Sequence, residues 1–272
     1  MEAIVVSGSF DNIQSREVRF LEEASKFGPV HVYLWSDAVV KAATGALPKF
    51  PQKERKYFLE ALRFVYKVQP IDHLPNPDEL PQIAGFKPII WAVLEDQDTA
   101  HKRVFCTSKG IIYMVIKDKD LDGFPIPPIT QATSSPIKKV LVTGCYDWLH
   151  SGHVRFFEET SELGDLYVVV GHDENLRLLK GEGHPKFSED ERRYMVGAIR
   201  YVKHALISSG SGWMDAEPEI ALIKPDIYAV NEDGDRPEKR MFCEKYWLEY
   251  AVLKRTPAAG LPRRESTHLR GF

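Results

Sequence analysis

The chain has 272 residues, which leaves room for two ordinary domains with a core each. Its hydrophobic content of 43% and charged content of 28% are those of a soluble globular protein, and its formal net charge of -3 argues against a general nucleic-acid binder. The three cysteines include no Cys-x-x-Cys pair. We therefore expect a cytoplasmic protein without disulfides, structural zinc or a nucleic-acid partner.

The first predicted strand covers residues 3–6, and no basic segment with a long apolar core precedes it. We therefore expect no signal peptide. The longest apolar runs, such as residues 89–94 and 166–170, have the length of a strand. A membrane span needs about 20 apolar residues, so the sequence predicts none.

The chain reads as the same domain twice. Residues 4–11 match residues 140–147, and the agreement continues as far as residues 105–106 and 242–243. A stretch rich in proline and small polar residues, 124–136, precedes the second copy and is typical of an extended linker. We place the first domain at residues 1–134 and the second at residues 135–272.

Each repeat alternates short apolar runs with segments of helical period, which predicts right-handed βαβ units around a parallel sheet. The fold class is therefore α/β, with two tandem Rossmann-like domains, each a parallel sheet flanked by helices, that together form a pseudo-dimer. The predicted strands of the second repeat are residues 140–143, 166–171, 204–207, 227–230 and 248–253.

One predicted helix of the second repeat begins with a capping box at residues 188–191, where Ser188 and Glu191 can each satisfy a free N–H group. Met195, Ala198, Ile199 and Val202 follow it as an apolar stripe at helical spacing, which we interpret as core. Pro51 stands at the Ser188 position of the first repeat, so the matching helix is capped differently.

The most informative segment follows the strand at 140–143. Gly144 ends the strand, and His150, Gly152 and His153 open an amphipathic helix. Two imidazoles three residues apart share one helix face, and the free N–H groups at a helix start favour an anion. The segment therefore predicts a phosphate site, with Gly152 leaving room for close approach.

The Gly-Cys-Tyr-Asp sequence at 144–147 followed by His-Ser-Gly-His at 150–153 resembles the HxGH motif of the nucleotidyltransferase superfamily, and is most similar to its cytidylyltransferase branch. The tandem layout is similar to that of ethanolamine-phosphate cytidylyltransferases. The resemblance implies that His150 and His153 donate hydrogen bonds to phosphate oxygens as negative charge develops. It also implies a lysine that contacts the triphosphate; Lys180 and Lys186 are the candidates, and Lys180 is favoured because its counterpart is Thr44.

The late part of the chain resembles the motif in which an arginine precedes Gly-Ile-Ser-Thr-Thr, but an insertion separates Arg255 from Ser266 and Thr267. Arg255, Arg263 and Arg264 are alternatives for the phosphate-binding arginine, and we select Arg264. The nucleotide-binding residues implied by the resemblance are Thr143, Gly144, Cys145, Tyr146, Asp147, Gly152, Asn231, Arg264, Ser266 and Thr267.

The first repeat has lost both histidines, since Gln14, Ser15, Arg16 and Glu17 stand at positions 150–153 of the second repeat. A carboxylate a few ångströms from a triphosphate is repulsive. We therefore expect the first repeat to be non-catalytic and to pair with the catalytic second one.

The predicted function is transfer of CMP from CTP to a phosphorylated small alcohol or phosphonate, with release of pyrophosphate. The alternatives are an adenylyltransferase that uses ATP, or a non-catalytic nucleotide-binding regulatory protein. Mg²⁺ is expected with the triphosphate, without a dedicated protein metal site. The sequence leaves open whether the intramolecular pair associates further as a homodimer.

Overall fold

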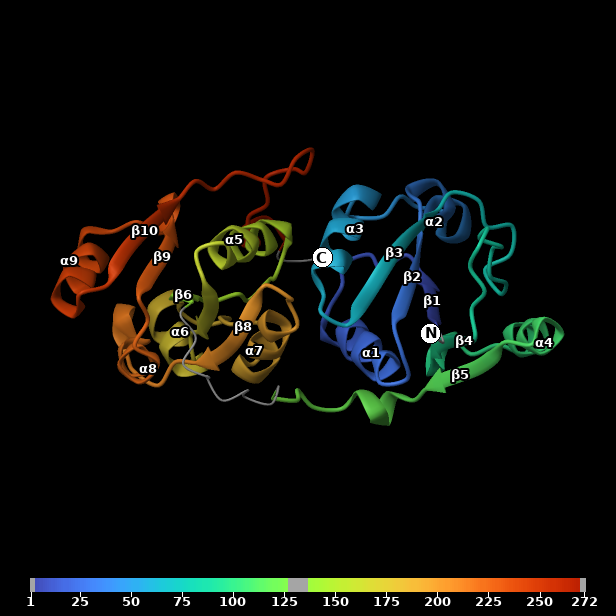
Figure 1. Cartoon of the computed structure of the whole chain (residues 1–272), viewed down its shortest axis with the longest axis horizontal. Helices are drawn as coiled ribbons and strands as arrows, with labels where there is room; N and C mark the ends of the chain where they lie inside the picture. The colour runs from blue at the N-terminus through green and yellow to red at the C-terminus, as the bar shows by residue number, and fades with distance from the viewer. Residues whose placement is uncertain (1–2, 127–136, 270–272) are drawn as a thin grey trace. The chain divides into compact units, whose positions relative to one another are not determined.

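The computed structural model describes residues 3–126 and 137–269, which divide into two compact units, Met1–Gly123 and Phe124–Phe272. Each unit contains a five-stranded sheet whose paired strands run parallel, with helices packed on it (Figure 1). The predicted α/β class with two helix-flanked parallel sheets is confirmed, and the pseudo-dimer stays a prediction. The predicted domain boundary after residue 134 lies outside the described residues.

The first unit has the strand order β3-β2-β1-β4-β5. Short 3-10 helices follow two of the strands, η1 (Glu95–Gln97) and η2 (Asp118–Leu121). The main elements are β1 (Ile4–Gly8), α1 (Ser15–Ser25), β2 (Val30–Trp35), α2 (Asp37–Thr44), α3 (Gln52–Ala61), β3 (Val65–Ile71), β4 (Ile90–Leu94), α4 (Ala100–Lys109) and β5 (Ile112–Ile116).

The second unit repeats this order as β8-β7-β6-β9-β10. Its short helices are η3 (Gly212–Met214), η4 (Glu232–Gly234) and α10 (Ser266–Leu269). The five predicted strands are present with ends shifted by one or two residues. The main elements are β6 (Lys139–Gly144), α5 (Ser151–Ser161), β7 (Asp165–Val170), α6 (Asp173–Lys180), α7 (Glu189–Gly197), β8 (Val202–Ile207), α8 (Glu217–Ile223), β9 (Ile227–Asn231), α9 (Pro237–Tyr246) and β10 (Glu249–Leu253).

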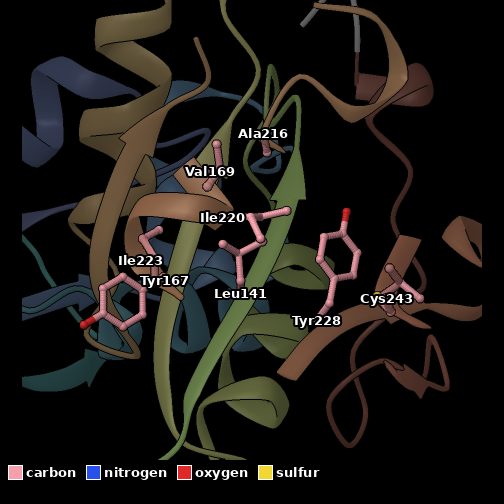
Figure 2. Close-up of a cluster of buried hydrophobic side chains, with 9 residues drawn as sticks. Leu141, Tyr167, Val169, Ala216, Ile220, Ile223, Tyr228 and Cys243 are labelled. Carbon is pink, nitrogen blue, oxygen red and sulfur yellow. The ribbon is translucent and has the colours of Figure 1, made fainter. Parts of the chain in front are cut away.

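One face of the second sheet is covered by α8 and α9. Side chains of β6, β7 and β9 meet α8 residues such as Ile220 and Ile223 in a buried cluster that also contains Cys243 of α9 (Figure 2). Successive strand residues point to opposite faces, so the alternate residues Val140, Val142 and Val168 face the other side, where α5 and α7 pack against β7. Among the described residues, no helix has the length and apolarity needed to cross a bilayer.

The capped helix is shorter than its apolar stripe predicts. Ser188 caps α7 as expected, since its Oγ accepts the N–H of Glu191 at 3.3 Å. The helix ends at Gly197, however, so Ala198 and Ile199 lie in the turn that follows and Val202 begins β8. These residues are buried, which confirms the core interpretation, but the stripe joins a helix to a strand.

The helices α4 and α9 end in the same left-handed conformation with different residues. Gly110 after α4 has φ 64°, and Trp247 after α9 has φ 57°. Glycine adopts this conformation freely, whereas a residue with a Cβ is strained in it by about 1–2 kcal/mol. The Trp247 side chain is 94% exposed, so it gains little from burial in return.

We therefore expect Trp247→Gly to raise the free energy of unfolding by about 1 kcal/mol, because the relief of strain exceeds the entropy that glycine adds to the unfolded chain. Urea titration followed by far-ultraviolet circular dichroism measures this change. Gly110→Ala is the matched control and should lower the free energy of unfolding by a similar amount. A less stable Trp247→Gly variant would contradict the strain argument.

Candidate functional site

The candidate site lies where the strand order reverses, between β6 and β9. These strands pair only at Val140 with Ile227 and Leu141 with Tyr228, whereas β6 pairs with β7 along its whole length. The strands therefore diverge toward their carboxyl ends, which is where doubly wound sheets bind ligands. A pocket of about 270 Å³ opens there, lined by the ends of β6 and β9, the start of α5 and the end of α6.

The turn after β6 has a strained backbone. Tyr146 has φ 53°, in the left-handed region that bulky residues avoid. Its ring packs against Phe157 and His153, with centroids at 5.2 and 5.3 Å. A Cβ on Gly144 would lie 2.7 Å from the Tyr146 ring. The glycine is therefore required so that the aromatic ring can fold back under the turn.

The two motif histidines stack at the start of α5, with ring centroids 3.9 Å apart. His150 is the N-cap residue, and its Nδ1 accepts the backbone N–H of Gly152 at 3.1 Å. This hydrogen bond assigns the ring proton to Nε2. A Cβ on Gly152 would lie 3.0 Å from the His150 ring, so the glycine makes room for the cap.

Both rings hold a buried nitrogen that no described residue pairs with, His150 Nε2 and His153 Nδ1. Buried polar atoms are normally hydrogen-bonded, so these two are suited to a polar ligand. Burial lowers the pKa of His150 to about 3, and the charges of Arg255 and Arg264 act in the same direction. Burial also holds the pKa of His153 well below its usual value, so both rings are neutral at pH 7.

Arg255 brings positive charge to the pocket from the segment after β10. One of its amino groups lies 2.6 Å from Asp233 Oδ2, and the other donates to the backbone carbonyl of Arg264 at 3.0 Å. Arg264 itself lines an adjoining hollow together with Arg155 and Arg263. Of the three alternative arginines, Arg255 is therefore the one that lines the histidine pocket.

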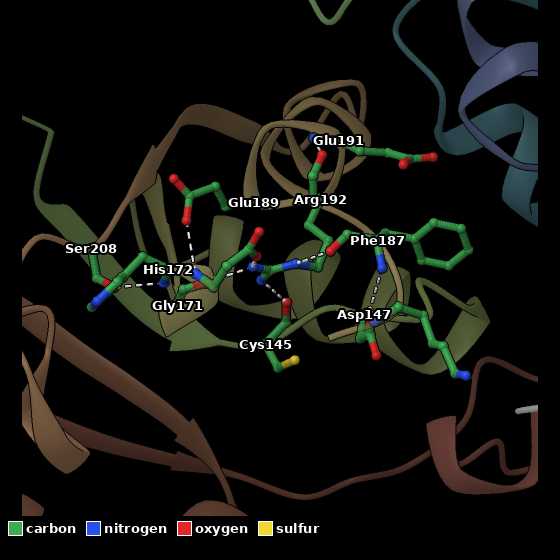
Figure 3. A network of polar contacts seen from close by, with 12 residues as sticks. Cys145, Asp147, Gly171, His172, Phe187, Glu189, Glu191, Arg192 and Ser208 are labelled. Atoms are coloured by element: carbon green, nitrogen blue, oxygen red, sulfur yellow. Dashed lines mark hydrogen bonds and ion pairs between the residues drawn. The ribbon is translucent and has the colours of Figure 1, made fainter. Parts of the chain in front are cut away.

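A buried arginine, Arg192 of α7, holds the backbone segments next to the pocket together (Figure 3). It donates hydrogen bonds to the carbonyl groups of Cys145 at 2.7 Å, Gly171 at 2.8 Å and Phe187 at 2.9 Å, and it lies 2.7 Å from Asp173 Oδ1. One side chain thus joins the turn after β6, the end of β7, the start of α6 and the segment before α7.

Asp147 holds the loop before α7 against the turn after β6. Its Oδ1 accepts the backbone N–H groups of Lys186 and Phe187 at 2.7 and 3.1 Å. Asp147 lines the pocket, but this carboxylate oxygen is occupied by the loop before α7. Lys180, at the end of α6, also lines the pocket, whereas Lys186 is not part of its lining.

The structure brings together most of the residues selected from the sequence. Arg264 lies in the adjoining hollow, and the Thr267 side chain lies outside the described residues. Thr143 Oγ1 lies 2.8 Å from Tyr228 Oη, and Ser266 Oγ reaches the carbonyl of Trp148 at 3.4 Å. The selected residues that line the histidine pocket are Thr143, Gly144, Cys145, Tyr146, Asp147, His150, Gly152, His153, Lys180, Asn231 and Ser266.

Lys239 of α9 and Asp233 also line the pocket, and sequence reasoning selected neither of them. Burial lowers the pKa of Lys239. The counterpart of Lys239 in the first unit is Lys102, which instead forms an ion pair with Asp78 at 2.8 Å. Because a lysine is present in both copies, comparison of the repeats alone did not single it out.

The first unit has exchanged the charges of this site. Arg16 stands at the position of Gly152, and its guanidinium lies 2.8 Å from Asp118 and 3.1 Å from Asp96. Asp118 occupies the position of Arg255. Glu17, at the position of His153, accepts the backbone N–H of Gln14 at 3.0 Å and so caps its own helix. The first unit therefore has acidic groups where the second has a cation.

Comparison with known proteins gives one family match. The model of a family described as cytidylyltransferase-like matches residues 141–238, which lie in the second unit. Those residues include the turn after β6, the two histidines, Arg192 and the end of β9.

Two archaeal proteins named FAD synthase are similar in sequence. The one from Ferroglobus placidus is 36% identical over 120 residues, covering 44% of this chain and 70% of that protein. The one from Methanocella paludicola is 33% identical over 135 residues, covering 48% of this chain and 93% of that protein. The bifunctional protein HldE of Desulfatibacillum aliphaticivorans is 38% identical over 92 residues, covering 33% of this chain but only 18% of that protein.

The depressed pKa of His150 predicts a loss of stability in acid. Below pH 6.5 the unfolded chain binds a proton at this residue and the folded chain does not, so the free energy of unfolding falls as the pH drops toward 3. Between pH 6.5 and 5 this loss amounts to about 1.5 kcal/mol. In His150→Gln the free energy of unfolding should fall between these two pH values by about 1.5 kcal/mol less than in the wild type. Urea titrations at pH 6.5 and pH 5 measure this difference.

The exposed His73 provides the matched control for this experiment. His73→Gln should retain the wild-type dependence on pH. Equal slopes for His150→Gln and the wild type would mean that His150 is not held neutral by its surroundings.

Proposed function

The chain belongs to the cytidylyltransferase-like nucleotidyltransferases of the HxGH superfamily, and we propose that its second unit transfers a nucleotidyl group from a nucleoside triphosphate to a phosphorylated acceptor. The observation that carries this proposal is the stacked pair of neutral histidines at a helix start beside Arg255, each with one buried ring nitrogen that no described residue pairs with. A helix N-terminus with donors and a cation around it suits a phosphate chain.

In this reaction an oxygen of the acceptor phosphate attacks the α-phosphorus, and the bond from that phosphorus to the bridging oxygen breaks. The electron pair of the broken bond leaves with pyrophosphate, so no covalent enzyme intermediate is needed. The protein aligns the two reactants and stabilises the developing charge. We assign this charge stabilisation to the Nε2–H of His150, to the His153 ring, and to the cations Lys180 and Arg255.

We propose ATP as the nucleotide. Support comes from the relatives named FAD synthase, because FAD consists of FMN joined to an adenylyl group. CTP is the second candidate, favoured by the description of the matched family as cytidylyltransferase-like. We propose that Asn231, Asp233 and Lys239, at the β9 side of the pocket, contact the nucleotide on that side.

Members of the family generally use a divalent cation together with the triphosphate, and we propose Mg²⁺ here. The described residues contain no group of three or more histidine, cysteine, aspartate or glutamate side chains that would hold a metal ion. Asp233 is the acidic pocket residue nearest to Arg255 and is engaged with it. The triphosphate itself would therefore be the main ligand of the ion.

We propose that the first unit does not carry out the transfer. Its Arg16 takes the place of Gly152 and is held by Asp96 and Asp118. Those carboxylates oppose a triphosphate, and Glu17 lacks the imidazole of His153. The shared strand order would therefore support chemistry in one copy only.

The test is pyrophosphate release with ATP, CTP, GTP or UTP, each offered with FMN, phosphorylated small alcohols and phosphonates in the presence of Mg²⁺. We expect release with ATP and one acceptor, and a loss of at least about 100-fold in kcat/KM in His153→Ala, because a buried donor to the transition state is removed. Release with CTP alone would favour the second candidate.

Glu17→Gln, at the same position of the first unit, is the matched control and should leave pyrophosphate release unchanged. Equal activity of His153→Ala and the wild type would refute the assignment of the site. Binding of a nucleotide without release across the panel would instead favour a regulatory protein.

A further inference from the structure

A second pocket lies in the first unit, on the opposite edge of its sheet from the positions that match the histidine site. It has a volume of about 410 Å³, within the range of small-molecule sites. Its walls come from the segment between β3 and β4 and from the end of α4. Lys87 and Ile111 mark its position, because they precede β4 and β5 at the amino ends of these strands. We refer to this cavity as the Lys87 pocket.

The Lys87 pocket lies where the first unit has no counterpart of α8. In the second unit α8 covers the corresponding face, and Ile220 and Ile223 fill the space above the sheet (Figure 2). Residues 72–89 of the first unit contain turns and one isolated bridge between Ile83 and Phe86, but no helix. Without the helix, the sheet face is covered less completely and a cavity remains.

The Lys87 pocket has apolar walls and a polar rim that carries two lysines and one carboxylate, Glu79, which accepts a hydrogen bond from the Asn76 amide at 3.0 Å. Ile83, Phe86, Phe105 and Ile111 supply apolar walls, and two of these are aromatic. Lys87 and Lys109 are both exposed at this cavity, and neither forms an ion pair in the described part of the chain. Lys109 lies over the ring of Phe105, with its Nζ 5.9 Å from the centroid.

The layer beneath the Lys87 pocket contains two unsatisfied polar atoms. Tyr33 Oη and Trp91 Nε1 are buried without a hydrogen-bond partner among the described residues, and both side chains belong to the cluster that includes Ile83, Phe86 and Phe105. In the second unit Tyr228, the counterpart of Trp91, has its hydroxyl 2.8 Å from Thr143 Oγ1. Both atoms can donate a hydrogen bond, but Tyr33 and Trp91 are not part of the pocket lining, so they do not contact an occupant of the cavity.

We propose that the Lys87 pocket binds a small aromatic monoanion, whose flat apolar body lies between Phe86 and Phe105 and whose carboxylate or sulfonate faces Lys87 and Lys109. The charge of the rim and the aromatic walls together select this class over neutral apolar molecules or highly charged phosphates. This site is independent of the proposed transfer reaction, because its residues lie in the first unit and none of them belongs to the histidine pocket.

The probe for this proposal is anilinonaphthalene sulfonate, an aromatic monoanion whose fluorescence rises on binding, titrated into the full chain. We expect saturable binding with energy transfer from tryptophan, since the Trp91 ring lies 6.0 Å from that of Phe105. The double variant Lys87→Gln/Lys109→Gln should weaken binding by about tenfold, because the two lysines together contribute an attraction of about 1.4 kcal/mol.

Lys53→Gln, an exposed lysine of the same unit, is the matched control and should bind like the wild type. The uncharged analogue phenylnaphthylamine should bind to the wild type more weakly than the sulfonate does. Its affinity for the double variant should equal its affinity for the wild type. Unchanged sulfonate binding in the double variant would overturn the proposal, because the probe would then occupy another site such as the histidine pocket. Absence of saturable binding to the wild type would overturn it as well.

Discussion

The buried guanidinium of Arg192 is the interaction on which the second unit's site depends. A charge in an interior is costly unless each of its donors is satisfied, and here three carbonyl groups and the Asp173 carboxylate provide the acceptors. These partners belong to three separate segments, around residues 145, 171–173 and 187, that meet at the carboxyl edge of the sheet. The first unit builds the same arrangement with Arg55, which reaches the carbonyl groups of Ser9, Trp35 and Phe50 and the Asp37 carboxylate. The arginine is therefore part of the shared scaffold, and the chemistry of the pocket is added above it.

The two copies share their strand order but differ in where they place charge. In the second unit Gly152 leaves the helix start open, and Arg255 provides a cation held by Asp233. In the first unit the cation has moved onto the helix as Arg16, and Asp118 takes the position of Arg255. In both copies the arginine has carboxylate partners, Asp233 for Arg255 and both Asp96 and Asp118 for Arg16. A second difference is that the first unit has no counterpart of α8, and the Lys87 pocket lies at that position.

Local patterns in the sequence predicted much of this architecture, because strands buried on both faces appear as apolar runs. The repeat helped as well, since most elements could be identified in both copies. The histidine pair was also visible, since a cap and its helix are neighbours in sequence. The role of Arg192 was not visible in the sequence, because the residues around a buried helix arginine can have the same pattern as those around an exposed one. Only the assembled sheet brings the four partners of Arg192 together. The choice among Arg255, Arg263 and Arg264 likewise depended on the path of the chain after β10. Lys239 was missed for the same reason, as its burial arises from elements distant in sequence.

The strained turn after β6 has a counterpart in the first unit, where Phe10 has φ 47° at the position of Tyr146. Such a conformation has a cost in free energy, yet the copy without histidines has kept it. The simplest history is that the turn was inherited before the copies diverged and persists because Arg55 still binds the carbonyl group of Ser9 beside it. The first unit has thus retained the backbone conformation of the turn without the histidines that follow it in the second unit. A second catalytic centre in this chain would require new side chains at positions 14, 16, 17, 44 and 118, whereas the left-handed turn at Phe10 is already present.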